Sequence, residues 1–582
     1  MHSRTIPNPH RRNRGLSRRS LFVALLALTG AGLTRAATIE PSSRPNIVVI
    51  LVDDMGWSDI GCYGSEIPTP NLDALARGGL RFTQFYNTGR CSPTRASLMT
   101  GLYPHQAGMG HLDNLVRPNS TGTTGRLSDR CVTLGEVLRE AGYFTAVTGK
   151  WHLGHEHGTP PWERGFMRNL TLRAGGVYWA EQRGKANQPL YLNGREMPRN
   201  APEFGNDWYG PYLWTKWGLK FIDEALAERK PFFLYLAHCS PHFPLMAPQE
   251  DIARYRGKYR SGWDVLREAR YRRQIEMGLI RPEWTLSERP PDVPAWDRLS
   301  AAEQDRYDHL MAIYAAMIDT MDRSVGRMVD GLRDRGVLDN TLLVFLSDNG
   351  GNAESGPKGR SEGDLLGGPD SNVFLGMCWA TLNNTPFRRY KHFTHEGGIS
   401  APCILHWPDG MNLPSESPAL RPTPQGIVTD TPAHLVDVMA TAVDVAAASY
   451  PTEFRGHAIL PMEGVSLRPL FHGQAVARPN PIFFEHEGNR AIRSGDWKLV
   501  QKHRGPWELY NLAEDRTEQV DLAASQPKRA AALRTQWRAW ADRAFVDPWP
   551  GPARTDWGAV PAKPKQEARQ AETESTPGRD PD

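Results

Sequence analysis

Four apolar runs of five to eight residues constrain the fold of this 582-residue chain more than any other feature. They are rich in β-branched and aromatic residues and lack polar alternation, which predicts strands buried on both faces. Helical patterns lie between them, most clearly at about 302–335 and 134–141, each followed by a glycine. Strands that alternate with helices predict an α/β domain with a mostly parallel central sheet. The four runs are residues 45–52, 143–147, 232–236 and 341–346.

The pattern changes after about residue 455. Short strands separated by Gly- and Asp-containing turns, and then one helix, predict a smaller α+β domain with an antiparallel sheet. The expected strands are 481–486, 489–494, 497–501 and 508–512, and the expected helix is about 528–545. We therefore divide the chain into a signal peptide (1–36), a main domain (37–454), a C-terminal sheet domain (455–559) and a disordered tail (560–582).

The first 36 residues have the three parts of a secretory signal. A basic stretch precedes the apolar run 21–28, and small residues around Ala36 offer a cleavage site. Within the basic stretch, residues 17–22 (SRRSLF) resemble a twin-arginine export signal. No later segment approaches the roughly 20 apolar residues that a membrane span needs. We expect a periplasmic or secreted protein without stable membrane insertion; an uncleaved amphipathic anchor is the alternative.

Charge and cysteine content exclude several classes of protein. The leader holds seven arginines and no acidic residue, so the rest of the chain is net negative although the formal charge of the whole is +4. We therefore expect no nucleic-acid partner. Six scattered cysteines without a CxxC pair indicate neither a disulfide framework nor a zinc site.

Polar side chains follow each of the four predicted strands. Because the carboxyl ends of parallel strands share one edge of a sheet, these groups should converge in one cleft. The carboxylates would repel each other if buried without a cation, and oxygen ligands favour calcium or magnesium. Taken singly, Asp-Gly and Asp-Asn-Gly sequences often only form turns. The groups are Asp53 and Asp54, Lys150 and His152, His242, and Asp348 and Asn349.

Residues 91–101 read as a short helix with Cys91 at its N-terminal end. We expect Ser92 as the N-cap, Pro93 in the first turn and Gly101 at the end. A helix N-terminus favours negative charge, which suggests an activated thiolate or an oxyanion site. A buried, inert cysteine is the alternative.

The sequence CSPTRASLMTG, residues 91–101, resembles the signature of the sulfatase family. Order and spacing agree with that family from about residue 45 to 550, and the larger bacterial arylsulfatases are the most similar. The resemblance implies an alkaline-phosphatase-like fold and hydrolysis of small-molecule or carbohydrate sulfate esters; we expect aryl sulfates, while alkyl and sugar sulfates remain open. The other matching segments are 53–56 (DDMG), 149–154 (GKWHLG), 240–244 (SPHFP), 347–351 (SDNGG), 384–391 (NTPFRRYK) and 395–398 (HEGG).

The resemblance also implies a role for each matching residue. A formylglycine-generating enzyme would oxidise Cys91 to an aldehyde, whose hydrate supplies the oxygen that attacks sulfur. Arg95 would stabilise that oxygen, while Lys150 and Lys391 would contact the sulfate. His242 or Lys391 would protonate the leaving alcohol, and His152 would accept a proton from the second hydroxyl of the hydrate. One Ca²⁺ would be held by Asp53, Asp54, Asp348, Asn349 and the modified Cys91.

Two other functions remain open on the sequence. An enzyme of the same superfamily that acts on phosphonate monoesters or phosphodiesters can share these motifs. A non-catalytic, calcium-dependent binder of sulfated glycans would fit a chain that had lost its catalytic residues. His238 competes with His242 for the acid role, and residues 245–300 are either a structural insertion or part of the substrate entrance.

Overall fold

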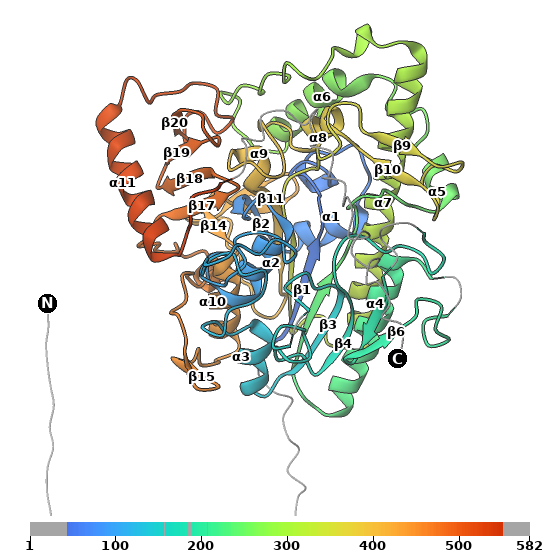
Figure 1. Cartoon of the computed structure of the whole chain (residues 1–582), viewed down its shortest axis with the longest axis vertical. Coiled ribbons are helices and arrows are strands. Elements are labelled where there is room, and N and C mark those ends of the chain that lie inside the picture. The colour runs from blue at the N-terminus through green and yellow to red at the C-terminus, as the bar shows by residue number, and fades with distance from the viewer. Residues whose placement is uncertain (1–43, 156, 184–187, 206–207, 551–582) are drawn as a thin grey trace, which may run out of the picture. The chain divides into compact units, whose positions relative to one another are not determined.

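The computed structural model describes residues 44–155, 157–183, 188–205 and 208–550 (Figure 1), so the leader and the whole of the expected tail lie outside the described residues. Its centre is a 12-stranded sheet. Strand β1 (Asn46–Val52) lies between β7 (Phe232–Ala237) and β8 (Thr341–Ser347), with β3 (Phe144–Lys150) beyond β7. All these neighbours pair in parallel, which confirms the four predicted strands and the predicted sheet.

The sheet extends on both sides with strands that the sequence did not reveal. Beyond β8, strand β11 (Ser400–His406) runs antiparallel to both β8 and β2 (Leu80–Tyr86). Beyond β3, β4 (Arg168–Leu172) is parallel. The short outer strands are β5 (Leu190–Leu192), β6 (Arg195–Met197), β12 (Arg421–Thr423), β13 (Gly426–Thr429) and β14 (Ala433–His434).

Helices cover both faces of the sheet because successive side chains of each strand point to opposite faces. Val48 and Ile50 of β1 belong to the hydrophobic cluster that includes α4 (Gly210–Ala227) and α7 (Ala301–Asp334). Ile47, Val49 and Leu51 belong to the cluster on the other face. That face carries α2 (Cys91–Thr100), α3 (Leu134–Glu140) and α10 (Val436–Val445).

Helices α3 and α7 begin and end close to where the sequence predicts. Each starts with a capping box, in which a hydroxyl and a glutamate three residues later satisfy two free N–H groups. Thr133 and Glu136 form it in α3, and Ser300 and Glu303 in α7. The other helices of the main domain are α1 (Pro70–Arg77), α5 (Gln249–Ala253), α6 (Gly262–Glu276), α8 (Met377–Asn383) and α9 (Glu396–Ile399).

The C-terminal residues form a separate four-stranded antiparallel sheet with one helix, as predicted. The strands are β17 (Ile482–His486), β18 (Asn489–Ser494), β19 (Trp497–Gln501) and β20 (Trp507–Asn511), and the helix is α11 (Pro527–Arg543). On one face Phe483 stacks on Trp540 of α11 at 5.0 Å between ring centroids. On the other face Phe484 packs against Tyr86 of β2.

A buried group of charges joins this sheet to the main domain. Lys498 Nζ of β19 lies 2.8 Å from carboxylate oxygens of both Glu396 and Glu518. Arg516 Nε lies 3.2 Å from Glu396, and all four side chains are fully buried. Buried charges are tolerated only when they are paired, so this group fixes how the sheet is seated.

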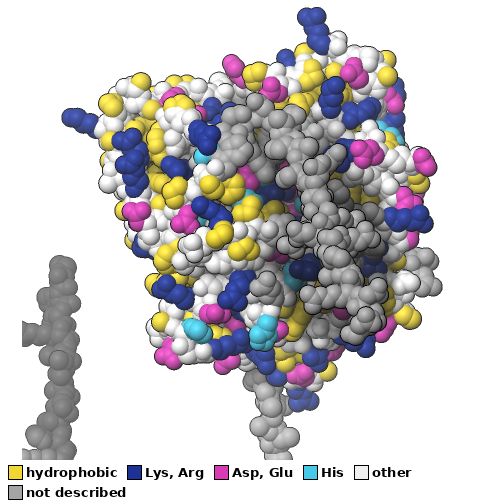
Figure 2. Space-filling view, viewed as in Figure 1, with side chains coloured by type: hydrophobic (Ala, Val, Ile, Leu, Met, Phe, Trp, Pro, Cys, Tyr) yellow, Lys and Arg dark blue, Asp and Glu magenta, His cyan; other side chains and the backbone are white. Residues whose placement is uncertain are grey.

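Two further observations concern the surface and the membrane. On the face shown in Figure 2, basic, acidic and hydrophobic side chains are intermixed. Among the described residues, no helix combines the length and the apolar character that crossing a bilayer requires.

Candidate active site

The predicted polar groups converge at the carboxyl edge of the parallel strands. Lys150 Nζ, at the end of β3, lies 2.6 Å from Asp53 Oδ2, which follows β1. Asp348 Oδ1, after β8, accepts a hydrogen bond from the backbone N–H of Asp54 at 3.1 Å. Asn349 Nδ2 donates to Asp54 Oδ1 at 2.7 Å. Groups that are up to 295 residues apart in sequence therefore lie in direct contact.

Helix α2 brings Cys91 and Arg95 into this group. Arg95 Nη2 lies 3.1 Å from Asp348 Oδ2 and 3.4 Å from Asp53 Oδ2. Ligand atoms of Cys91, Asp53 and Asp348 all lie within 4.8 Å of one another. The cysteine is therefore part of the carboxylate site and not an isolated core residue.

The expected N-cap of α2 was wrong by two residues. The helix begins at Cys91, the extended residue before it is Arg90, and Ser92 lies inside the first turn. The Ser92 hydroxyl is buried without a hydrogen-bond partner among the described residues. Because the whole helix is buried, tertiary packing and not a side-chain cap fixes where it starts. Gly101 ends the helix with a φ of 68°, as expected.

The donor set fits a hard divalent cation. Asp53 Oδ1 and Asn349 Oδ1 are buried, and neither has a hydrogen-bond partner in the described part of the chain. Buried oxygens are almost always satisfied, so two unpaired oxygens beside three carboxylates mark a place for a cation. Burial and the neighbouring Asp53 raise the pKa of Asp348 well above its usual value, which shows how crowded the negative charge is.

Two backbone positions at this edge are strained. Asp54 has a φ of 67° and His152 a φ of 59°, in the left-handed region that non-glycine residues rarely adopt. Such strain costs free energy and is found mainly at functional sites.

The irregular segment after α8 brings Lys391 into the site. Lys391 Nζ lies 2.7 Å from Asp54 Oδ1 and 5.8 Å from the centre of the Phe243 ring. Burial disfavours its charge, but Asp54 and Glu354 outweigh this and raise the pKa of Lys391 above its usual value. Lys391 is therefore protonated at neutral pH.

Of the two competing histidines, His242 reaches the site. Its Nε2 lies 3.6 Å from Asp54 Oδ2, and it lines a cleft of about 790 Å³ together with His152. His238 is fully buried and does not line that cleft. Burial lowers the pKa of His242 to about 4, so the ring is neutral at neutral pH.

His152 has a partner that the sequence did not reveal. Its Nε2 lies 3.4 Å from Asp113 Oδ1, which comes from the loop between α2 and α3. Burial, helped by the charge of Lys150, lowers the pKa of His152 to about 4. A neutral imidazole held by a carboxylate is suited to accept a proton.

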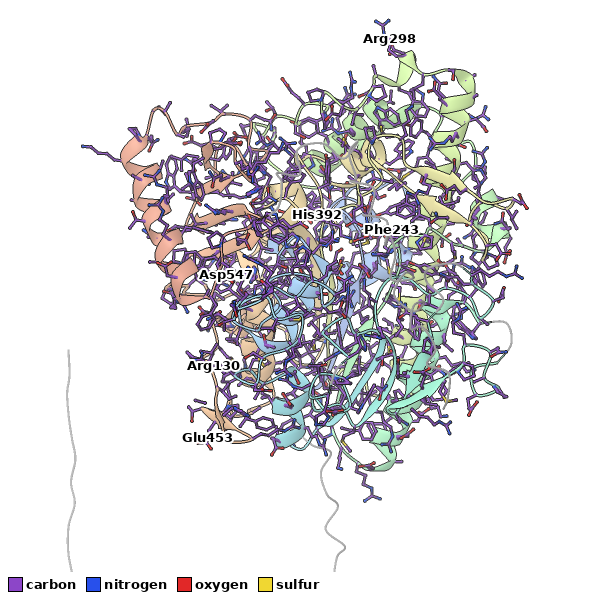
Figure 3. The ribbon with its side chains drawn as sticks, in the orientation of Figure 1. Arg130, Phe243, Arg298, His392, Glu453 and Asp547 are labelled. Atoms are coloured by element: carbon purple, nitrogen blue, oxygen red, sulfur yellow. The ribbon has the colours of Figure 1, made fainter. Side chains whose placement is uncertain are left out.

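One wall of the cleft offers stacked rings. Phe243 stacks on Phe374 and on His242, with ring centroids 4.2 Å apart in each pair. Phe243 is labelled in Figure 3 near the centre of the view, close to His392. Residues 245–300 do not line this cleft; they form α5, α6 and the turns around them.

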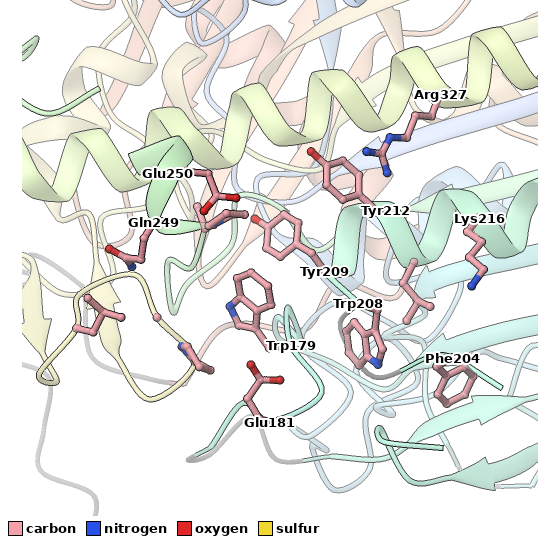
Figure 4. A pocket seen from close by; sticks show the side chains of 17 residues that line it. Trp179, Glu181, Phe204, Trp208, Tyr209, Tyr212, Lys216, Gln249, Glu250 and Arg327 are labelled. Carbon is pink, nitrogen blue, oxygen red and sulfur yellow. The ribbon is translucent and has the colours of Figure 1, made fainter. Parts of the chain in front are cut away.

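A second cavity, of about 900 Å³, lies beside α4 and α7 (Figure 4). Trp179, Tyr209 and Tyr212 line it, and none of the predicted site residues does. Tyr178, the neighbour of Trp179, donates hydrogen bonds to the backbone carbonyls of Cys239 and His242. This cavity is thus separate from the cleft but is connected to the loop that carries His242.

Comparison with known proteins identifies the family of this chain. The family model described as Sulfatase matches residues 45–448. An uncharacterized sulfatase of Schizosaccharomyces pombe is 34% identical over 534 residues, covering 85% of this chain and 93% of that protein. The arylsulfatase of Klebsiella aerogenes is 32% identical over 464 residues, covering 77% of this chain and 96% of that protein.

Solved structures show the same fold. The crystal structure of Ps i-CgsB has a TM-score of 0.63 at 26% identity and covers 87% of this chain and 95% of its own. The same protein in complex with k-i-k-neocarrahexaose has a TM-score of 0.62 at 27% identity. With the family model, the relatives and the folds in agreement, this chain belongs to the sulfatase family and is a sulfuric ester hydrolase.

Proposed function

We propose that this enzyme hydrolyses aryl sulfates with a formylglycine derived from Cys91 and one bound Ca²⁺. The observation that carries the proposal is the position of Cys91 at the start of a buried helix. There its sulfur lies within 4.8 Å of carboxylate oxygens of Asp53 and Asp348. An inert core cysteine would not be placed among buried carboxylates, whose charge needs compensation.

The cation would be held by oxygens of Asp53, Asp54, Asp348 and Asn349, beside the modified Cys91. Bound there, it would supply Lewis-acid polarisation and neutralise the carboxylates. Arg95 adds fixed positive charge on the same side, since it lies 3.1 Å from Asp348. Lys150 and Lys391 are aimed at the same space and would bind the sulfate oxygens.

Proton transfers are divided between opposite ends of the site. Lys391 carries a proton at neutral pH, so it is the group that can give a proton to the leaving oxygen in the resting state. His242 lines the cleft next to it and would orient the leaving group. His152, neutral and held by Asp113, would accept the proton of the aldehyde hydrate when sulfate is released.

The stacked rings of Phe243 and Phe374 support an aryl leaving group. Both line the cleft and give its wall beside His242 an apolar, aromatic surface, where the released alcohol would leave.

We also propose that the chain is exported and that its two folded parts are a catalytic domain (37–454) and a C-terminal domain (455–559). The leader supports a periplasmic or secreted location reached through the twin-arginine route. Cys91 is buried in the folded protein, so a formylglycine-generating enzyme would have to act before folding is complete.

Paired rates test the substrate class. We expect kcat/KM on 4-nitrophenyl sulfate to exceed that on a 4-nitrophenyl phosphonate monoester and on a sulfated hexose. Cys91→Ala should abolish turnover and keep the fold, because alanine fills less space in the same helix. A preference for the phosphonate would show that the enzyme does not primarily transfer sulfate. A preference for the sulfated hexose would show that the released alcohol is a sugar and not a phenol.

A further inference from the structure

A cluster of buried charged side chains lies directly behind the proposed active site. It consists of Arg90, His111, Glu354, His392 and Glu487, which we call the Glu487 cluster. Their side chains are between 2% and 14% exposed. Four of them belong to the main domain, and Glu487 alone comes from the C-terminal sheet. None of the five was identified from the sequence as a site residue.

His392 is held between two carboxylates. Its Nδ1 lies 3.0 Å from Glu487 Oε2, and its Nε2 lies 2.8 Å from Glu354 Oε1. Arg90 Nη1 also contacts the ring, 3.2 Å from Nδ1, so His392 is packed among three charged side chains. Burial disfavours the charge of Glu487, but His392 and His111 outweigh this and hold the pKa of Glu487 well below its usual value. Glu487 is therefore an ionised anchor for the His392 ring.

The cluster is directly connected to two proposed catalytic residues. His392 follows Lys391 in the chain, and Glu354 Oε2 lies 3.8 Å from Lys391 Nζ. Arg90 pairs with Glu354 and is the residue immediately before Cys91, where α2 begins. The position of Glu354 therefore influences both the lysine and the start of the Cys91 helix.

The backbone of the cluster is strained where its two halves meet. His392 has a φ of 82°, and Glu487 has a φ of 50°. Glu487 and Gly488 form the two-residue turn between β17 and β18, with positive φ at both positions. Such turns strongly favour Asn-Gly, because only glycine and asparagine adopt this conformation readily.

The same chain contains the favoured version of that turn. Asn193 and Gly194 join β5 to β6 with φ angles of 50° and 80°. A glutamate at the equivalent position in the β17–β18 turn therefore carries a backbone cost that the turn itself does not require, and its carboxylate instead pairs with His111 and His392. A residue that is strained, buried and ionised in this way is typical of a functional position.

A metal site is a weaker interpretation of the same residues. Ligand atoms of His111, His486 and Glu487 lie within 4.8 Å of one another. However, His111 Nδ1 accepts a hydrogen bond from the N–H of Leu112 at 2.7 Å, so its proton is on Nε2. That nitrogen lies 2.9 Å from Glu487 Oε1 and donates to it. The pair is a satisfied hydrogen bond and not a pair of free ligands.

We propose that Glu487 of the C-terminal sheet is a positioning residue for sulfate ester hydrolysis. It fixes the His392 ring and, through Glu354 and Arg90, the placement of Lys391 and of the N-terminal end of the Cys91 helix. The inference rests on the proposed function of that site. It assigns the C-terminal sheet, which lies beyond residues 45–448 matched by the family model, an indirect part in catalysis through the residues that it positions.

Glu487→Asn separates this role from a structural one, because asparagine is the residue that the turn prefers. We expect the variant to fold but to lose part of the stability that the buried pairs with His111 and His392 supply, because the relaxed turn offsets only some of it; the unfolding midpoint in urea measures this loss. We expect kcat on 4-nitrophenyl sulfate to fall about 10- to 100-fold, the usual size of an outer-shell effect, while KM changes little. Glu487→Gln, which keeps the shape and loses the charge, should show the same loss of kcat.

Arg455→Asn is the matched control. Arg455 and Gly456 form the same kind of turn between β15 (Glu453–Phe454) and β16 (His457–Ala458), with φ angles of 51° and 79°. Glu453 is labelled far from His392 in Figure 3. This variant should relax its turn in the same way, lose the contacts of Arg455 with Glu136 and with the Glu163 carbonyl, and retain the kcat of the wild type.

Three results would contradict the proposed role of Glu487. If Glu487→Asn keeps the kcat of the wild type, the inference about Glu487 fails and the proposed function of the enzyme stands. A loss of kcat that parallels a loss of folded protein, or of the aldehyde at position 91 measured by mass spectrometry, would also overturn it. A wild-type enzyme without sulfate ester hydrolysis would refute the proposed function and this inference together.

Discussion

Removing the charge of Lys498 should destabilise the seating of the C-terminal sheet. Lys498 is fully buried, and its Nζ lies 2.8 Å from both Glu396 and Glu518. Lys498→Met keeps most of the side-chain volume and leaves both carboxylates without this partner. Breaking a buried ion pair costs about 3–5 kcal/mol, because the remaining charge is buried without compensation.

The contacts that remain place the expected cost at the lower end of that range. Arg516 Nε stays 3.2 Å from Glu396, and Glu518 Oε2 keeps a hydrogen bond at 3.0 Å from the backbone N–H of Glu396. We therefore expect the free energy of unfolding to fall by about 3 kcal/mol at pH 8. Urea unfolding followed by tryptophan fluorescence gives this value by linear extrapolation.

The pH dependence provides an independent check. In the wild type, burial opposes the charge of Glu396, yet Lys498 and Arg516 hold its pKa at about 2. This is below the unfolded value, so the stability that it contributes is present at neutral pH and is lost as the pH falls through about 2. In Lys498→Met a carboxylate pKa should rise above the unfolded value, so the defect should be smaller at pH 5 than at pH 8.

A second variant tests the cause. Adding Glu518→Gln to Lys498→Met removes the excess negative charge and should recover part of the lost stability, which a double-mutant cycle measures. A loss below about 1 kcal/mol in Lys498→Met, or no recovery in the double variant, would show that these charges do not seat the sheet.

Three other predictions follow from the site and the sheet. Calcium added to protein stripped with a chelator should stabilise the fold by about 2.7 kcal/mol when its concentration is 100 times its Kd. Differential scanning fluorimetry should show this as a higher thermal midpoint, and an unchanged midpoint would argue against the carboxylate site. Asp113→Asn should lower kcat with little change in stability, because His152 loses the carboxylate at 3.4 Å; steady-state kinetics with unchanged kcat would show that His152 needs no such partner. Gly149→Ala should yield little folded protein, since its Cβ would lie 1.9 Å from the carbonyl oxygen of Ala237 at a φ of 97°; normal soluble yield would contradict the close packing of β3 and β7.

The sequence predicted the part of the site that strand order determines. Asp53, Lys150 and Asp348 each end a parallel strand, so burial of the strands was enough to bring them to one edge. The four central strands were recognisable because strands buried on both faces are apolar throughout. Among the missed strands, β5 and β12 are short and partly exposed, whereas β2 (LRFTQFY) and β11 (SAPCILH) are buried but have apolar runs interrupted by polar residues or proline.

Other parts of the site depend on contacts that no local pattern encodes. The placement of Lys391 relies on an irregular segment that contacts the C-terminal sheet through Arg388 and His392, and only the family resemblance identified it. Asp113 and Glu487 reach the site from a loop and from a turn in a different sheet. The one visible signal was an atypical turn, a glutamate where a hairpin favours asparagine.

The central claim is that Cys91 carries an aldehyde next to a cation site at the edge of the buried sheet. Mass spectrometry of the peptide that contains residue 91, from enzyme produced with a formylglycine-generating enzyme, tests it most directly. We predict an aldehyde in place of the thiol in the active fraction, in proportion to turnover. Full sulfate ester hydrolysis by protein that retains an unmodified thiol at position 91 would contradict the account.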